Sequence, residues 1–133
     1  SASTRLLIHG ASGRMGQALL RLCAERDDCS IVGAVSRKVG QRVIDGVPQF
    51  ASSELHGVPD FDVAVDFSLA EAFDPILALC VERGTALVSG TTGLDENQRV
   101  AIAAAADRTP VLWAENFSLG VAVLSELVER AAA

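Results

Sequence analysis

The sequence predicts an α/β fold, namely a Rossmann-like, doubly wound parallel sheet with helices on both faces, formed by a single domain spanning residues 1–133. Two observations predict it. Short apolar segments with the length of buried strands alternate along the chain with segments of helical periodicity. Regularly spaced glycines join the first apolar segment to the first helix, as in a phosphate-binding strand-turn-helix unit. Half of the 133 residues are apolar, which is enough for a buried core.

The first unit begins with an apolar strand at 6–8, which reaches Gly10 through His9. Gly13 and Gly16 follow at intervals of three. Glycines let the backbone approach a phosphate closely, and the start of the next helix offers free N–H groups and a positive dipole end to an anion. A glycine-rich turn without any ligand remains an alternative at this point. The helix carries one apolar stripe, formed by Met15, Ala18, Leu19, Leu22 and Cys23.

The remaining elements follow from the same patterns. The next helix has Asp74 as its expected cap with Pro75 in the first turn, although it can begin as early as Leu69, and Gly84 ends it. Asp95 is the expected cap of the helix after that. We expect the segment 39–59 to be irregular, with a turn at 45–46 and one short helical turn near 53–55. Four more strands are expected at 30–35, 61–67, 85–89 and 110–114, and further helices at 95–106 and from 119 onward.

Composition excludes several classes of protein. The net charge of −6 argues against a nucleic-acid surface, which needs clustered Lys and Arg. The apolar runs are much shorter than the roughly 20 residues of a membrane span, and the first residues lack the apolar core of a signal peptide, so we expect a cytoplasmic protein. Cys23, Cys29 and Cys80 form no metal-binding motif with the two histidines. We expect the cysteines to be buried free thiols, and no metal site.

Small, polar or glycine residues follow each expected strand. In a parallel sheet these positions share one edge, which is where open α/β sheets bind their ligands. A purely structural domain has no need of this arrangement five times, so the pattern favours a ligand-binding site. The segments concerned are 10–16, 36–38, 66–68, 90–93 and 116–118.

The residues after the second strand indicate which dinucleotide binds. NAD sites usually carry an acidic residue there, whereas this chain has Ser36, Arg37 and Lys38. The two cations would attract a 2′-phosphate, and Arg14 at the start of the first helix can help. We therefore expect NADPH to bind at least as well as NADH, with a merely solvated loop at 37–38 as the alternative.

Three other side chains have structural interpretations that we favour. His9 ends a buried strand beside the glycine turn and is expected to form local hydrogen bonds. Asp66 could act as a general base, but an Asp at a strand end more often caps loop N–H groups. Trp113 is expected to belong to the core.

Four motifs together resemble the bacterial dihydrodipicolinate reductases, also called 4-hydroxy-tetrahydrodipicolinate reductases, of lysine and diaminopimelate biosynthesis. The resemblance covers nearly the whole chain. The motifs are IHGASGRMG at 8–16, VDFS at 65–68, GTTG at 90–93 and NFSLG at 116–120.

The resemblance implies a role for each motif. The first would hold the pyrophosphate, Arg37 the 2′-phosphate, and Phe67 with Ser68 the cofactor groove. Gly90 and Thr92 would contact the nicotinamide ribose and carboxamide, with Thr92 also facing the substrate. Asn116 and Phe117 would close over the nicotinamide. The pyrophosphate residues would be Gly10, Gly13, Arg14, Met15 and Gly16.

The family also implies what lies outside this chain. Its substrate-binding and catalytic residues belong to a second domain, and this sequence contains no motif like theirs. We therefore expect no catalytic residue here, and a chain that binds cofactor without turning over substrate. The intact enzyme, expected to be a homotetramer, would reduce its small-molecule ring substrate to tetrahydrodipicolinate. Two alternatives are a stand-alone nucleotide-sensing module and a different two-domain dehydrogenase; the GRMG and GTTG motifs argue against the latter.

Overall fold

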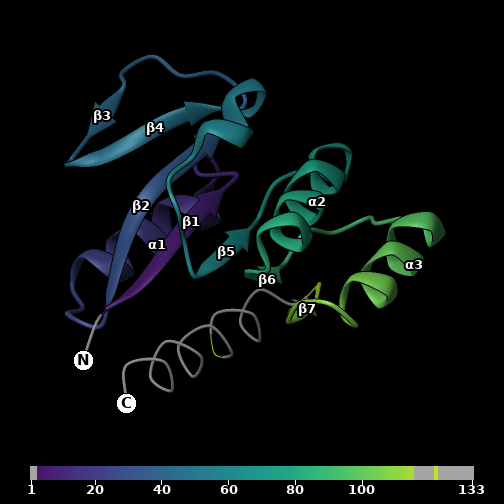
Figure 1. Ribbon diagram of the computed structural model, residues 1–133. Helices are drawn as coiled ribbons and strands as arrows, with labels where there is room; N and C mark the ends of the chain where they lie inside the picture. The colour runs from purple at the N-terminus through teal and green to yellow at the C-terminus, as the bar shows by residue number, and fades with distance from the viewer. Residues whose placement is uncertain (1–2, 116–121, 123–133) are drawn as a thin grey trace.

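The computed structural model describes residues 3–115 and residue 122 (Figure 1). The helix expected from residue 119 lies outside these residues except for residue 122, which is helical. The elements, in chain order, are β1 (Thr4–His9), α1 (Arg14–Ala24), β2 (Cys29–Ser36), β3 (Val43–Ile44), β4 (Val47–Ala51), the 3₁₀ helix η1 (Ser52–Gly57), β5 (Val63–Asp66), the 3₁₀ helix η2 (Ala70–Ala72), α2 (Phe73–Arg83), β6 (Ala86–Ser89), α3 (Glu96–Ala105) and β7 (Val111–Trp113).

The strands form one sheet in the order β3-β4-β2-β1-β5-β6-β7. All neighbouring strands are parallel except β3, which runs antiparallel to β4. The chain starts in the middle of the sheet, builds outward through β2, and returns to build the other half through β5, β6 and β7. This reversal of direction beside β1 is the topological switch point of a doubly wound sheet, so the predicted fold class is confirmed.

The prediction of an irregular segment at 39–59 is wrong because it missed two strands, but the expected turn at 45–46 and the expected helical turn near 53–55 are both present. This segment forms β3, β4 and η1, and β4 extends the parallel sheet by pairing Ala34 with Gln49. Between β3 and β4, Asp45 and Gly46 have φ angles of 51° and 80°. Two residues with positive φ make the tight turn whose twist matches that of a hairpin, and Asp-Gly is a preferred sequence for it.

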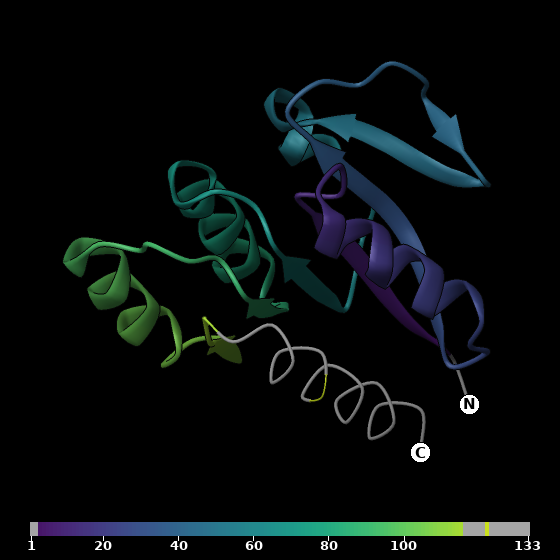
Figure 2. The same cartoon turned by 180° about the vertical axis from the view of Figure 1, so that it is seen from behind.

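Each face of the sheet has its own apolar core, because side chains alternate along every strand. Leu6 and Ile8 of β1 pack with Leu19 of α1, which lies over β1 and β2 in Figure 2. Leu7 points to the opposite face, where it joins Phe73 of α2 and the residues around η1. The helices therefore lie on both faces, as predicted.

The helix ends follow the expected signals in two of three cases. Asp95 caps α3 by accepting the Gln98 N–H at 2.8 Å, and Gly84 ends α2 with a φ of 67°. Asp74 does not cap α2: it lies in the first turn, and Ala72 is the N-cap residue. The reason is that η2 leads directly into α2, so that the helix starts before Asp74.

The cysteines are not all free thiols. Cys23 and Cys29 form a disulfide that joins the end of α1 to the start of β2, with their Cα atoms 6.0 Å apart. The tight connection at 25–28 brings them together, which their spacing alone does not reveal. Cys80 is free, and burial raises the pKa of its thiol to about 11. Among the described residues, no helix has the length and apolarity to cross a membrane.

Candidate cofactor site

A groove of about 520 Å³ opens at the carboxyl ends of β1, β2 and β5. Its walls come from the glycine turn, the end of β2, the start of η1 and the segment between β5 and α2. The residues lining it are His9, Gly10, Ser12, Gly13, Val35, Ser36, Arg37, Ser52, Leu55, Phe67, Ser68, Leu69, Glu71, Ala72 and Pro75.

The glycine turn is packed too tightly for side chains at two positions. A Cβ on Gly10, whose φ is 83°, would lie 2.7 Å from the backbone carbon of Phe67 and the nitrogen of Ser68. A Cβ on Gly16 would lie 2.6 Å from the carbonyl oxygen of Gly10. The first glycine therefore lets the turn approach the end of β5, and the third lets α1 approach the turn. Gly13 is less constrained, since its nearest contact would be 3.6 Å away.

The N-terminus of α1 is available to an anion. Gly13 is its N-cap residue, no side chain caps it, and its first turn contains no acidic residue. The first N–H groups of a helix have no partner within the helix, and the dipole makes this end positive. Arg14 is exposed at this end and Met15 is partly buried, and neither lines the groove.

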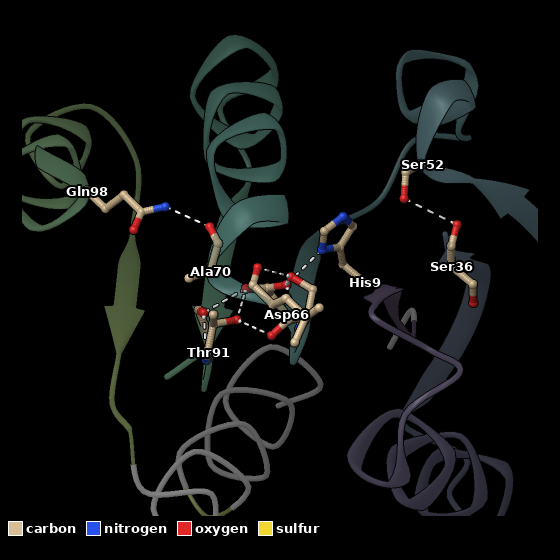
Figure 3. A network of polar contacts seen from close by, with 10 residues as sticks. His9, Ser36, Ser52, Asp66, Ala70, Thr91 and Gln98 are labelled. Carbon is tan, nitrogen blue, oxygen red and sulfur yellow. Dashed lines mark hydrogen bonds and ion pairs between the residues drawn. The ribbon is translucent and has the colours of Figure 1, made fainter. Parts of the chain in front are cut away.

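The end of β2 contributes a cation to the groove. Arg37 is exposed there and forms no ion pair or hydrogen bond within the described part of the chain, so its guanidinium is free to bind a ligand. Ser52, at the start of η1, donates a 3.3 Å hydrogen bond to the Ser36 carbonyl and so connects η1 to this strand end (Figure 3). Lys38 is exposed and does not line the groove.

Phe67 and Ser68 line the groove directly after β5. Gly90, which follows β6, does not line the groove, but it leaves space for the ring of Phe67, which does. A Cβ on Gly90 would overlap the Phe67 ring, so the absence of a side chain there lets the ring lie against the β6 end.

Asp66, at the end of β5, is fully buried and accepts hydrogen bonds from three strand ends (Figure 3). One carboxylate oxygen, Oδ1, lies 2.7 Å from His9 Nδ1 of β1 and also accepts the Ser68 hydroxyl at 2.6 Å and the Ser68 N–H at 3.2 Å. The other, Oδ2, accepts the hydroxyls of Ser89 at 2.8 Å and Thr91 at 2.6 Å. We call these five residues the Asp66 network.

The network determines the charge of its central carboxyl group. Burial acts most strongly on Asp66 and favours its neutral form, but the hydrogen bonds and the attraction from His9 together outweigh burial, and the pKa of Asp66 lies below its ordinary value. The carboxylate is thus ionised and satisfied by its donors. Asp66 accepts the Ser68 N–H, as expected of a cap for the neighbouring loop. His9 is hydrogen-bonded as expected, but its partner lies on the neighbouring strand β5 and is distant in sequence.

The segment after β6 is held mainly through Thr91. Trp113, which packs partly buried against the core as predicted, donates its indole N–H to the Thr91 carbonyl at 2.8 Å. Thr92 is exposed and does not line the groove. Asn116 and Phe117, predicted to close over the nicotinamide, lie outside the described residues.

Sequence reasoning missed one wall of the groove. Ser52 and Leu55 belong to η1, whose position beside the end of β2 is not evident from the sequence. Leu69 precedes η2, and Pro75 lies in the first turn of α2. The Asp45-Gly46 turn was a usable signal for the β3–β4 hairpin and thus for the position of η1. Among the described residues, no three His, Cys, Asp or Glu side chains gather as a metal site would require.

The chain matches a known family over most of its length. The family model described as dihydrodipicolinate reductase, N-terminus, matches residues 4–117. A 4-hydroxy-tetrahydrodipicolinate reductase of Stenotrophomonas maltophilia (strain R551-3) is 70% identical over 130 residues, covering 96% of this chain and 54% of that protein. The enzyme of the same name from Xanthomonas campestris pv. campestris (strain B100) is 65% identical over 133 residues, covering 99% and 56%.

A solved structure shows the same fold. The dipicolinate-bound dihydrodipicolinate reductase from Paenisporosarcina sp. TG-14 superposes with a TM-score of 0.72 at 22% sequence identity, covering 98% of this chain and 54% of that one. The chain thus spans about half the length of the relatives that it matches.

Proposed function

Because this chain belongs to the dihydrodipicolinate reductase family, we propose that its groove binds NADP(H) and that it forms the cofactor-binding half of a 4-hydroxy-tetrahydrodipicolinate reductase. The observation that carries the proposal is the glycine turn. Its geometry leaves no room for a Cβ at Gly10 or Gly16, and it leads into a helix N-terminus that no side chain caps. That combination suits a pyrophosphate.

The other groove residues fit the rest of a dinucleotide. Arg37 would hold the 2′-phosphate, with no carboxylate beside it on the chain to oppose that charge. Phe67 and Ser68 would line the path toward the nicotinamide, and Gly90 and Thr92 would contact its ribose and carboxamide. Arg14 and Met15 would add to the pyrophosphate site from the first turn of α1, and Asn116 and Phe117 would complete the nicotinamide end.

When bound, the cofactor supplies the hydride. The residues of this chain bind and orient it, and none of them serves as a proton donor to substrate in our proposal. The substrate would be the ring precursor of tetrahydrodipicolinate, in lysine and diaminopimelate biosynthesis, and would face Thr92. Its binding and reduction would need the part of the relatives that this chain does not span, so we expect no turnover by the 133 residues alone. A homotetrameric, cytoplasmic intact enzyme belongs to the same proposal.

Calorimetric titration of the chain with NADPH and with NADH tests the proposal. We expect both to bind at one site and NADPH to bind at least as tightly, because Arg37 and Lys38 follow β2 where a carboxylate would favour NADH. Binding of neither nucleotide would contradict the proposed function. Clearly tighter binding of NADH would leave the family role standing but contradict the assignment of Arg37.

A further inference from the structure

Thr91 lies between two residues that we assign to the nicotinamide end of the cofactor, Gly90 and Thr92, yet it has no assigned role itself. It is 1% exposed, so it cannot contact a ligand in the groove. All of its polar groups are nonetheless bound. Its hydroxyl donates to Asp66 at 2.6 Å, its N–H donates to the Ser89 hydroxyl at 3.2 Å, and its carbonyl accepts from the Trp113 indole at 2.8 Å.

These bonds fix the segment 90–92 to three strands. Ser89 belongs to β6, Asp66 to β5 and Trp113 to β7, and the Gly90 N–H adds a 2.9 Å bond to the Asp66 carbonyl. The segment itself is neither helix nor strand. Its conformation therefore depends on these contacts rather than on a regular backbone ladder, and a backbone held at Thr91 has its two neighbours held as well.

The two oxygens of the Asp66 carboxylate have different donors. Oδ1 takes those of His9 and Ser68, beside the glycine turn and the groove lining, whereas Oδ2 takes the hydroxyls of Ser89 and Thr91. The Thr91 hydroxyl also lies 3.2 Å from the Ser68 carbonyl. Loss of this hydroxyl would thus release the segment after β6 and remove its contact with Ser68, while the contacts of Oδ1 with His9 and Ser68 would stay intact.

We propose that Thr91 is a positioning residue for the nicotinamide half of the cofactor: with Asp66 and Trp113 it holds the 90–92 backbone where Gly90 and Thr92 can contact the nicotinamide riboside. This inference rests on the proposed function and deepens it. Because preorganised contacts avoid the cost of ordering the segment on binding, their loss weakens affinity for whatever that segment touches and for nothing else.

The test separates the two halves of the ligand. Calorimetry on the 133-residue chain compares NADPH with adenosine 2′,5′-bisphosphate, which carries the adenine half and the 2′-phosphate but no nicotinamide. For Thr91→Val we expect a loss of about tenfold in NADPH affinity and less than a twofold change for the bisphosphate. The increase in dihydronicotinamide fluorescence on binding should fall in parallel. Thr91→Ser retains the hydroxyl and should have the NADPH affinity and the fluorescence increase of the unsubstituted chain.

Thr109→Val is the matched control. Thr109 is 3% exposed and donates its hydroxyl to the Thr85 carbonyl at 2.6 Å, before β6 and β7 and away from the groove. The Thr109→Val variant therefore loses a buried threonine hydroxyl, as Thr91→Val does, but should leave the affinities for NADPH and the bisphosphate unchanged. If Thr91→Val fails to fold, Trp113→Phe removes the bond to the Thr91 carbonyl from the other side, and a selective loss of about threefold for NADPH is expected.

The outcomes distinguish the two claims. An equal loss for NADPH and the bisphosphate, no loss for either, or the same loss in Thr109→Val would overturn the positioning role while leaving cofactor binding in place. If the unsubstituted chain binds neither NADPH nor the bisphosphate, the proposed function and the positioning role are both overturned. In the Trp113→Phe variant, unchanged NADPH affinity also counts against the positioning role.

Discussion

The two ends of the groove are built in different ways. Beside β1 and α1, the glycine turn is shaped by backbone approaching backbone, with Gly10 and Gly16 leaving no room for a side chain. Beside β5 and β6, the corresponding strand ends are held by side-chain hydroxyls and an imidazole around one buried carboxylate, Asp66. We therefore expect the first end to be disrupted by an added side chain and the second by the loss of a hydrogen-bond donor. Substitutions can test this difference from both sides.

The largest effect is expected from Gly10→Ala. The added methyl group would lie 2.7 Å from backbone atoms that cannot rotate away, and alanine at a φ of 83° is strained as well. We expect a loss of stability of roughly 3 kcal/mol and NADPH binding too weak to measure. Urea denaturation and calorimetry check these outcomes. Gly13→Ala is the control for stability and should cost only about 1 kcal/mol, since its nearest contact is 3.6 Å away. Equal stabilities for the two variants would contradict the backbone account.

Asp66→Asn tests the other end. The amide would present N–H groups to hydroxyls that now donate, so we expect a loss of about 2–3 kcal/mol at neutral pH. The Asp66 pKa is lower in the folded chain than its ordinary value, so the unfolded chain binds the proton more tightly. The wild-type advantage is therefore complete above the ordinary value of 3.8 and lost as the pH falls through the lower folded pKa. Denaturation curves between neutral and acid pH should converge.

Asp62→Asn is the comparison variant for this pH dependence. Asp62 bonds to Arg5 at 3.0 Å, but both side chains are largely exposed. Its removal should have a far smaller effect than that of Asp66, because solvent screens an exposed pair. If Asp62→Asn lost as much stability as Asp66→Asn, burial of the Asp66 network would not explain its contribution to stability.

Arg37→Ala is expected to change ligand binding without changing the stability of the fold, in contrast to the substitutions at Gly10 and Asp66. Arg37 is exposed and unpaired within the described residues, so stability should be unaffected. Because the variant would lose a charge-assisted contact with the 2′-phosphate, we expect its NADPH affinity to fall by about 10- to 100-fold. Its affinity for NADH, which has no 2′-phosphate, should be nearly unchanged. The neighbouring Lys38→Ala removes the same charge from outside the groove and should have little effect. Equal effects of the two variants would indicate only a general attraction of charges.

The smallest effect is expected from Gly90→Ala. The new methyl group would meet the Phe67 ring, which is a side chain and can move, in contrast to the backbone around Gly10. We expect the ring to shift toward the groove, with a loss of up to about tenfold in NADPH affinity and little change in stability. Calorimetry together with thermal melting would show this. A loss of stability as great as that of Gly10→Ala would contradict the distinction.

The same contrast explains how much could be predicted. Gly84, Asp95 and the glycine turn act over a few residues, so their spacing in the sequence predicted the helix ends and the first βα unit correctly. The Asp66 network joins residues 57 and 25 positions away from Asp66, and nothing in the spacing of His9 or Thr91 indicates that they share a carboxylate.

Other failures concern the connections between elements. A proline at 48 and the absence of clear alternation hid β4, even though the Asp45-Gly46 turn was evident. The Cys23–Cys29 disulfide depends on how α1 returns to β2. Asp74 fails to cap α2 because η2 leads into the helix, which agrees with the expected possibility of a start near Leu69. In each case the missing information was the position of a neighbouring segment in space.

Two hydrogen bonds between the glycine turn and β2 determine how ligand binding can be observed. The Val35 carbonyl accepts the N–H groups of both Gly10 and Ala11, at 2.9 and 3.0 Å. These two amides are already used by the sheet, so we expect an anion to be bound by the amides at the start of α1, 14–16. In hydrogen–deuterium exchange, Gly10 and Ala11 should exchange slowly with or without nucleotide. The amides at 14–16 should become protected only when a phosphate is bound, which gives a residue-by-residue record of occupancy.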